Sequence, residues 1–126
     1  MPQWSKQDVI TQAFSEIGMG SFQYDLQPED NQTALRKLDA MMATWGGTQG
    51  IRIGYSGGDG KGELTPSTMV PDWAYEALYL NLALRLCPDC GKQPSPLTVI
   101  AAKNALDAVR VRTVQIKPRH LSLIHI

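Results

Sequence analysis

Two cysteines at CxxC spacing are the residues of this sequence best suited by type to chemistry. Cys87 and Cys90 have the spacing that thiol redox enzymes use and that supplies half of a zinc site. Structural zinc needs four ligands, and the other strong candidates, His120 and His125, lie far along the chain without a second CxxC. A redox motif opens a helix after a strand, whereas this one closes a predicted helix. We therefore predict two thiols at a helix end, with Cys87 partly in the core.

Neither the acidic residues nor the glycine-rich segment forms a catalytic motif. The acids have no spacing that would hold two carboxylates across a scissile bond, and they are scattered as Glu16, Asp25, Asp39 and Glu76. The run Gly57–Gly62 contains a lysine, as phosphate loops do, but Gly62 follows Lys61 and no helix begins there. We expect solvated carboxylates and a flexible turn, with no catalytic residue, no metal site and no cofactor.

Basic residues collect near the C-terminus, although the whole chain is balanced in charge. It carries 12 Lys or Arg and 12 Asp or Glu, so no overall field steers it onto nucleic acid or an anionic membrane. From Ala108 onward there is no acid, and the cations are Arg110, Arg112, Lys117 and Arg119. These side chains could contact phosphates, although no aromatic residue interleaves with them for base stacking. The alternative is a solvated helix end whose cations complement the C-terminal carbonyls.

Four helices are predicted from helix start and stop signals and from apolar spacing. Ser5 and Asp8 have the spacing of a capping box, and prolines precede the other three apolar runs. The glycine pair at 46–47 and Pro88 are read as stops. The predicted ranges are about 6–17, 28–45, 71–88 and 95–112.

The apolar faces of these helices predict an all-α fold, a small four-helix bundle. The third helix is apolar on nearly every side, so it must be covered all round and is expected at the centre. Trp45 and Trp73 are assigned to the core. The inner face of the fourth helix is predicted as Leu97, Ile100, Ala101, Ala105, Leu106 and Val109. Residues 1–113 are thus a helical domain and residues 114–126 an extended C-terminal arm.

Residues 46–70 read as a long Gly-rich loop between the second and third helices. Alternating Ile51, Ile53 and Tyr55 suit an extended piece between turns. Compact domains rarely carry more than about 15 residues of connection unless the segment binds, moves or is ordered by a partner. This excess length marks the segment as a candidate contact region.

The composition excludes several classes of protein. A chain of 126 residues with 43% hydrophobic and 19% charged residues fits one folded domain and excludes wholesale disorder. No apolar window approaches the roughly 20 residues of a membrane span, and the N-terminus lacks a signal-peptide pattern, so we expect a cytoplasmic origin. The apolar end 121–126 is read as a partner-docking segment or as foreign sequence.

Two runs of residues resemble the tail accessory factor of short-tailed bacteriophages, also called the packaged-DNA stabilisation protein. The first is Leu-Asp-Ala-Met-Met-Ala-Thr-Trp at 38–45, and the second is Gly-Ile-Arg-Ile-Gly-Tyr at 50–55. Shorter matches are Ile17-Gly18 and Asn81-Leu82-Ala83, with Arg85 and Pro88-Asp89 behind it. The resemblance extends from residue 5 to about residue 113. Cys90 stands where an aromatic is expected, and the family continues into a longer arm after the fourth helix.

The resemblance implies a structural head-completion adaptor without catalysis. Twelve copies would form a ring beneath the portal protein, extend the DNA channel, retain packaged DNA and give later tail proteins a platform. The expected location is the head-tail junction of the virion, after assembly in the host cytoplasm. Residues 46–64, with Ile51, Arg52, Ile53 and Tyr55, are assigned to contacts with a neighbouring copy or a tail protein. Arg110, Arg112, Lys117 and Arg119 are assigned to a portal-facing or DNA-facing arm.

Two other classes stay open from the residues alone. One is a small helical enzyme, either a CxxC thiol redox protein or a carboxylate hydrolase. The other is a free-standing DNA-binding bundle, which predicts strong duplex binding by the monomer with a steep salt dependence. The balanced charge argues against the second class.

Overall fold

The computed structural model describes residues 4–18, 27–47, 50–51, 53–55 and 68–116. Residues 114–116 are described by their backbone alone. The described residues are mostly helical, which confirms the all-α prediction. Their elements are α1 (Lys6–Glu16), α2 (Pro28–Gly47), a 3₁₀ turn η1 (Asp72–Ala74), α3 (Tyr75–Cys90) and α4 (Pro96–Ile116).

The first helix starts and ends where local signals predict. The Ser5 hydroxyl accepts a hydrogen bond from the Asp8 backbone N–H at 3.2 Å, and the Asp8 carboxylate accepts one from the Ser5 backbone N–H at 2.9 Å. This reciprocal capping box satisfies backbone donors that the helix itself leaves open. After the last turn, Gly18 takes a φ of +81°, a conformation that suits glycine.

The predicted stop at Pro88 is wrong, because the proline lies inside the last turn of α3. Helix geometry continues to Cys90, and Gly91 then adopts a left-handed φ of +66°. The Lys92 N–H donates to the Cys87 carbonyl at 3.0 Å, and the Gly91 N–H donates to the Pro88 carbonyl at 3.3 Å. This pair of bonds is a Schellman motif, so glycine rather than proline ends the helix.

Two other helices also run past their predicted ends. The glycine pair at 46–47 belongs to α2 instead of following it, and the Ile51 N–H closes that end by donating to the Trp45 carbonyl at 2.8 Å. α4 continues beyond Arg112 to Ile116, since no glycine or proline interrupts it there. The boundary at residue 113 between domain and arm therefore falls within a helix.

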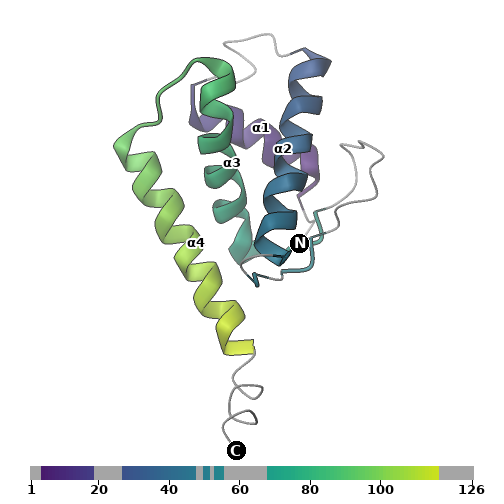
Figure 1. The fold of residues 1–126 in the computed structure, drawn as a ribbon, viewed down its shortest axis with the longest axis vertical. Coiled ribbons are helices and arrows are strands. Elements are labelled where there is room, and N and C mark those ends of the chain that lie inside the picture. The colour runs from purple at the N-terminus through teal and green to yellow at the C-terminus, as the bar shows by residue number, and fades with distance from the viewer. Residues whose placement is uncertain (1–3, 19–26, 48–49, 52, 56–67, 117–126) are drawn as a thin grey trace, which may run out of the picture.

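α3 is the central element, as predicted. It packs against α1, α2 and α4, and α1 also packs against α2. In Figure 1, α2 and α3 run antiparallel beside each other, α1 crosses them, and α4 returns antiparallel to α3. The side chains of α3 are buried on several sides of the helix, at Ala77, Leu78, Leu80, Leu82, Ala83, Leu86 and Cys87. Trp45, at 2% exposure, joins the same core.

Trp4 ties the start of the chain to α3 and to residue 68. Its indole stacks on the Tyr75 ring with centroids 4.9 Å apart, and the Tyr79 ring lies at 5.9 Å. The Trp4 backbone N–H donates a hydrogen bond to the Tyr75 hydroxyl at 2.9 Å. The Trp4 carbonyl accepts from both the N–H and the hydroxyl of the buried Thr68, each at 3.0 Å. These contacts hold the approach to α3 in place.

Three apolar residues that the sequence assigned to the interior are exposed. Trp73 is 38% exposed because it lies in the η1 turn at the edge of the core, ahead of the buried part of α3. Leu97 and Ile100 are 78% and 56% exposed. α4 instead turns Ala102 and Val109, both fully buried, toward α3. Small residues on this face allow close helix approach, and the larger ones are left outside.

Truncating one leucine on α3 tests the central position of this helix. We expect Leu82→Ala to lower the free energy of unfolding by about 2–5 kcal/mol, because it removes a fully buried side chain and leaves a cavity. The matched control is Leu97→Ala on α4, expected within about 0.5 kcal/mol of the unaltered chain. Urea unfolding followed by circular dichroism measures both. Equal losses for the two variants would contradict this packing.

Candidate functional site

The segment at the end of α2 begins inside the core. Ile51 and Ile53 are 3% and 8% exposed, and both belong to the main apolar cluster. A Cβ added to Gly54, whose φ is +82°, would lie 3.3 Å from the Met69 carbonyl oxygen. Residue 54 therefore passes beside residue 69. The described parts of the Gly-rich loop that precede and follow residues 56–67 thus lie next to each other. Glycine suits position 54, because it has no Cβ to meet the Met69 carbonyl and it adopts a positive φ without strain.

Tyr55 is anchored by an internal polar cluster that joins α1, α2 and this segment. Its hydroxyl donates to the Asp39 carboxylate at 2.6 Å, and the buried Lys6 ammonium reaches the same oxygen at 3.4 Å. The Lys6 nitrogen also lies 4.9 Å from the centre of the Tyr55 ring. Desolvation by burial, followed by the hydrogen bond and the charge of Asp39, raises the pKa of Tyr55 far above its ordinary value. The phenol is thus a fixed donor.

These placements bear on the four residues assigned to a subunit or tail-protein contact. Ile51, Ile53 and Tyr55 use their side chains within the chain, and Arg52 lies outside the described residues. The contact role of the segment stays a prediction. A neighbour meeting this folded chain would find exposed Gly54 here rather than the isoleucine side chains.

The described cations of the predicted arm lie on the second half of α4. Arg110 is 3.4 Å from Asp107, which also pairs with Lys103 at 2.8 Å. The hydrogen bond from Lys103, ahead of the charge of Arg110, lowers the pKa of the Asp107 carboxyl. Arg112 lies over the Trp73 ring at 4.8 Å, and this cation-π contact joins α4 to η1. Lys117 and Arg119 lie outside the described residues.

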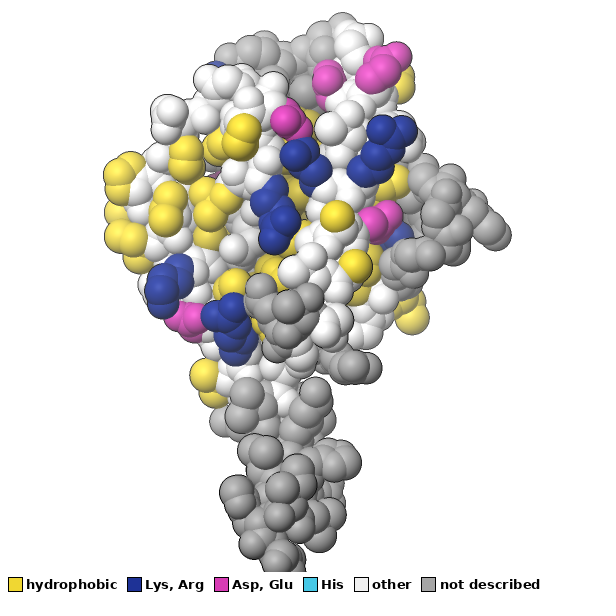
Figure 2. All heavy atoms as spheres, viewed as in Figure 1, with side chains coloured by type: hydrophobic (Ala, Val, Ile, Leu, Met, Phe, Trp, Pro, Cys, Tyr) yellow, Lys and Arg dark blue, Asp and Glu magenta, His cyan; other side chains and the backbone are white. Residues whose placement is uncertain are grey.

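An apolar surface on the outside of α4 is the feature that sequence reasoning missed. Four of the six large hydrophobic side chains exposed within the described ranges belong to this helix: Leu97, Val99, Ile100 and Val111. Figure 2 shows hydrophobic side chains gathered over α4, at the left of the view. The available signal was a second apolar stripe on a helix already read as having one.

The two thiols have the environment of structural cysteines. Both are free, and they sit on the last turn of α3, where Cys87 is 2% exposed. Burial raises the pKa of the Cys87 thiol, and burial followed by the charge of Asp89 raises that of Cys90. The attacking species in redox chemistry is the thiolate, which these shifts disfavour at neutral pH. The predicted helix-end position and the burial of Cys87 are confirmed.

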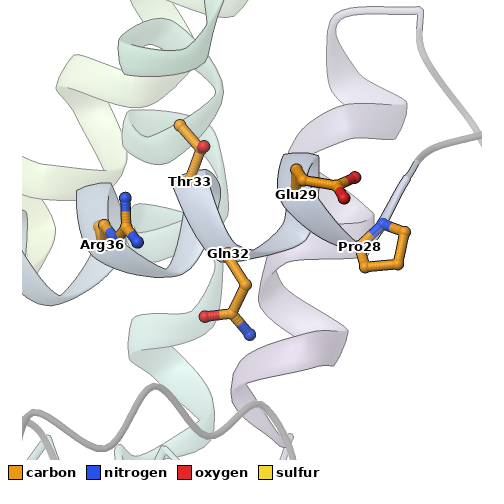
Figure 3. Close-up of a pocket in the computed structure, with 5 residues that line it drawn as sticks. All are labelled: Pro28, Glu29, Gln32, Thr33 and Arg36. Carbon is orange, nitrogen blue, oxygen red and sulfur yellow. The ribbon is translucent and has the colours of Figure 1, made fainter.

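A shallow hollow along α2 does not assemble a reactive site. Its lining comes from one helix, with Pro28, Glu29, Gln32, Thr33 and Arg36. In Figure 3, Thr33 and Gln32 point in opposite directions, so the polar groups do not converge on one point. Within the described ranges, no group of three or more His, Cys, Asp or Glu side chains is placed to hold a metal ion. None of the described helices combines the length and apolarity needed to cross a bilayer.

Comparison with known protein families finds a match along most of the chain. A family model described as the P22 tail accessory factor covers residues 1–121 of the chain. No curated protein sequence matches this chain significantly. The matched region includes all four helices and both resemblance runs, at 38–45 and 50–55.

Removing the Tyr55 hydroxyl tests the polar cluster. A raised pKa in the folded chain stabilises the neutral phenol, so this contribution is complete below the ordinary value of about 10 and declines as pH rises above it. We expect Tyr55→Phe to lower the free energy of unfolding at pH 7 by about 1–2 kcal/mol, since Asp39 loses a donor. Urea unfolding at pH 7, 9, 10 and 11 measures both effects. The difference between the two chains should shrink above pH 10, and a constant or growing difference would contradict the assignment.

Proposed function

Because the chain belongs to the P22 tail accessory factor family, we propose that it completes the phage head by forming a ring beneath the portal protein. Membership makes it a structural component of a short-tailed phage virion, associated with other virion proteins, and not an enzyme. In the proposed role the ring, of twelve copies, extends the DNA channel, retains packaged DNA and presents a platform to later tail proteins. Assembly takes place in the host cytoplasm.

The family match over residues 1–121 is the observation that carries this proposal. Two features of the described residues support a binding role. The thiols are buried or held in their protonated form, and the outer face of α4 leaves large apolar side chains in solvent. Large apolar side chains exposed together on one helix are typical of sites of protein association.

The cations on and beyond the last turns of α4 are proposed as the portal-facing or DNA-facing arm. Arg110 and Arg112 are exposed on the final turns of the helix, and Lys117 and Arg119 follow within seven residues of Arg112 in sequence. Their present partners, Asp107 and the Trp73 ring, are exposed as well, so the contacts are weak enough to be exchanged for a partner's acids or phosphates. Residues 46–64 are proposed as a second contact, with a neighbouring copy or a tail protein.

Mixing the purified chain with its cognate portal protein tests the proposed function. We expect native mass spectrometry to detect complexes whose mass equals one portal ring plus a full set of copies of this chain. Cooperative filling is expected, because each bound copy raises the effective concentration for the next. A mixture that contains only free portal and free chain at micromolar concentrations would overturn the proposal. A catalytic turnover by the lone chain would point to the enzyme class instead.

Replacing the four cations tests the arm. We expect Arg110→Ala, Arg112→Ala, Lys117→Ala and Arg119→Ala combined to weaken portal attachment about tenfold or more, because charge-assisted contacts are lost. The matched control is Lys103→Ala, which removes an exposed cation of α4 that shares Asp107 with Arg110. Attachment is measured at 50 and 150 mM salt. Unchanged attachment at 150 mM in the fourfold variant would rule out the arm assignment.

A further inference from the structure

A tryptophan and an arginine meet at the surface where α4 passes η1. The Arg112 guanidinium lies over the Trp73 ring, with its Cζ atom 4.8 Å from the ring centre. Both residues are exposed, Trp73 at 38%. Each adjoins a buried residue, since Ala74 is fully buried and Thr113 is 5% exposed. The backbone under the pair is therefore held by the core, and α4 also packs against η1.

The stacked guanidinium keeps its hydrogen-bonding edge available. An arginine meets an aromatic ring with its flat face, whereas its five N–H donors point outward in the plane of the group. Within the ranges that the structure describes, no hydrogen bond or ion pair uses the donors of Arg112. Arg110, two residues earlier, directs a donor to Asp107 at 3.4 Å. Arg112 can thus bind a ligand without releasing Trp73, whereas Arg110 already uses a donor within the chain.

A single carboxylate matches this pair better than a row of phosphates. Asp72 directly precedes Trp73 in η1, and Asp107 offsets the charge of Arg110. Described surface of such balanced charge gains little from a polyanion, which needs several unopposed cations. One planar carboxylate needs only two parallel N–H donors, and a single guanidinium supplies them. The exposed ring adds apolar contact area, and tryptophan and arginine are both enriched among the residues that dominate protein interfaces.

We propose that Trp73 is a positioning residue that presents Arg112 to an aspartate or glutamate of the portal protein. The proposal rests on the proposed function and assigns the strongest of its described cationic contacts to Arg112. The ring limits the conformations of a long side chain, so Arg112 loses less entropy when it binds. The ring also keeps water from one face of the guanidinium, and hydrogen bonds are stronger where water is excluded.

Binding of the full chain to immobilised portal rings at 150 mM salt tests the role of Arg112. We expect Arg112→Ala to weaken attachment about tenfold. Arg112→Lys should weaken it about fivefold, since an ammonium keeps the charge but lacks the paired donors. The matched control is Arg110→Ala on the same helix, whose loss should stay within about threefold because Arg110 is held by Asp107. Full attachment of Arg112→Lys, or equal losses for the two alanine variants, would overturn the proposal.

A double-mutant cycle tests whether Trp73 acts through Arg112. Trp73→Leu should weaken attachment about fivefold in the unaltered chain, but less than about twofold when Arg112 is already Ala. Trp73→Phe keeps an aromatic face and should stay within about twofold of the unaltered chain. Thermal unfolding followed by circular dichroism checks that each variant is folded at the assay temperature. Equal losses from Trp73→Leu in both backgrounds would overturn the positioning role. Lower stability without weaker attachment would show that the contact only ties α4 to η1, and would overturn it as well.

A short DNA duplex in place of the portal rings checks the identity of the partner. Loss of duplex binding by Arg112→Ala, with portal attachment unchanged, would assign the pair to phosphates and overturn the proposal. Equal portal attachment by Arg112→Ala and the unaltered chain would remove this inference and keep the proposed function. Failure of the unaltered chain to attach would remove the proposed function, and the portal carboxylate with it.

Discussion

The burial requirement of α3 determines how the rest of the described chain is arranged. A helix that is apolar on nearly every side cannot present a long face to water without a loss of folding free energy. The loss is about 25 cal/mol for each Å² of apolar surface left exposed. α1, α2 and α4 each cover part of it. The buried leucines at 78, 82 and 86 belong to one apolar cluster with side chains of all three helices. Trp4 and the Lys6 cluster then fix segments around a core that this single helix organises.

Covering α3 also explains why α4 has two apolar faces. The side that meets α3 uses small residues, with Ala102 and Val109 fully buried and Ala105 half-buried. Such residues permit a close approach and good packing of helix on helix. The longer side chains, Leu97 and Ile100, are then left on the other side, where nothing in the described chain covers them. Hydrophobic periodicity detects both stripes but does not rank them, and ranking by side-chain size selects the wrong one.

Local signals predicted the elements well, and long-range contacts account for what was missed. The capping box at Ser5 and the apolar spacing placed all four helices within a few residues. The stop at Pro88 failed because a competing signal, Gly91, lies three residues further on and accommodates the left-handed turn. Tyr55 and Asp39 are 16 residues apart in the sequence, and Asp39 and Lys6 are 33 residues apart. Neither propensity nor periodicity carries information over such separations, so the internal anchoring of this segment was not foreseen.

The position of the exposed apolar surface changes the energetics of assembly. A contact made by ordering a glycine-rich excursion would lose backbone entropy of about 1–2 kcal/mol for each residue fixed. The exposed apolar side chains of α4, Leu97, Ile100 and Val111, instead lie on a helix already held by α3 through contacts of Ala102, Val109 and the Asn81 amide. Binding through a preformed face needs little ordering, so even a small apolar area contributes net affinity. The same rigidity fixes where these side chains point, because the bond from the Asn81 amide to the Ala102 carbonyl holds the rotation of α4 on α3.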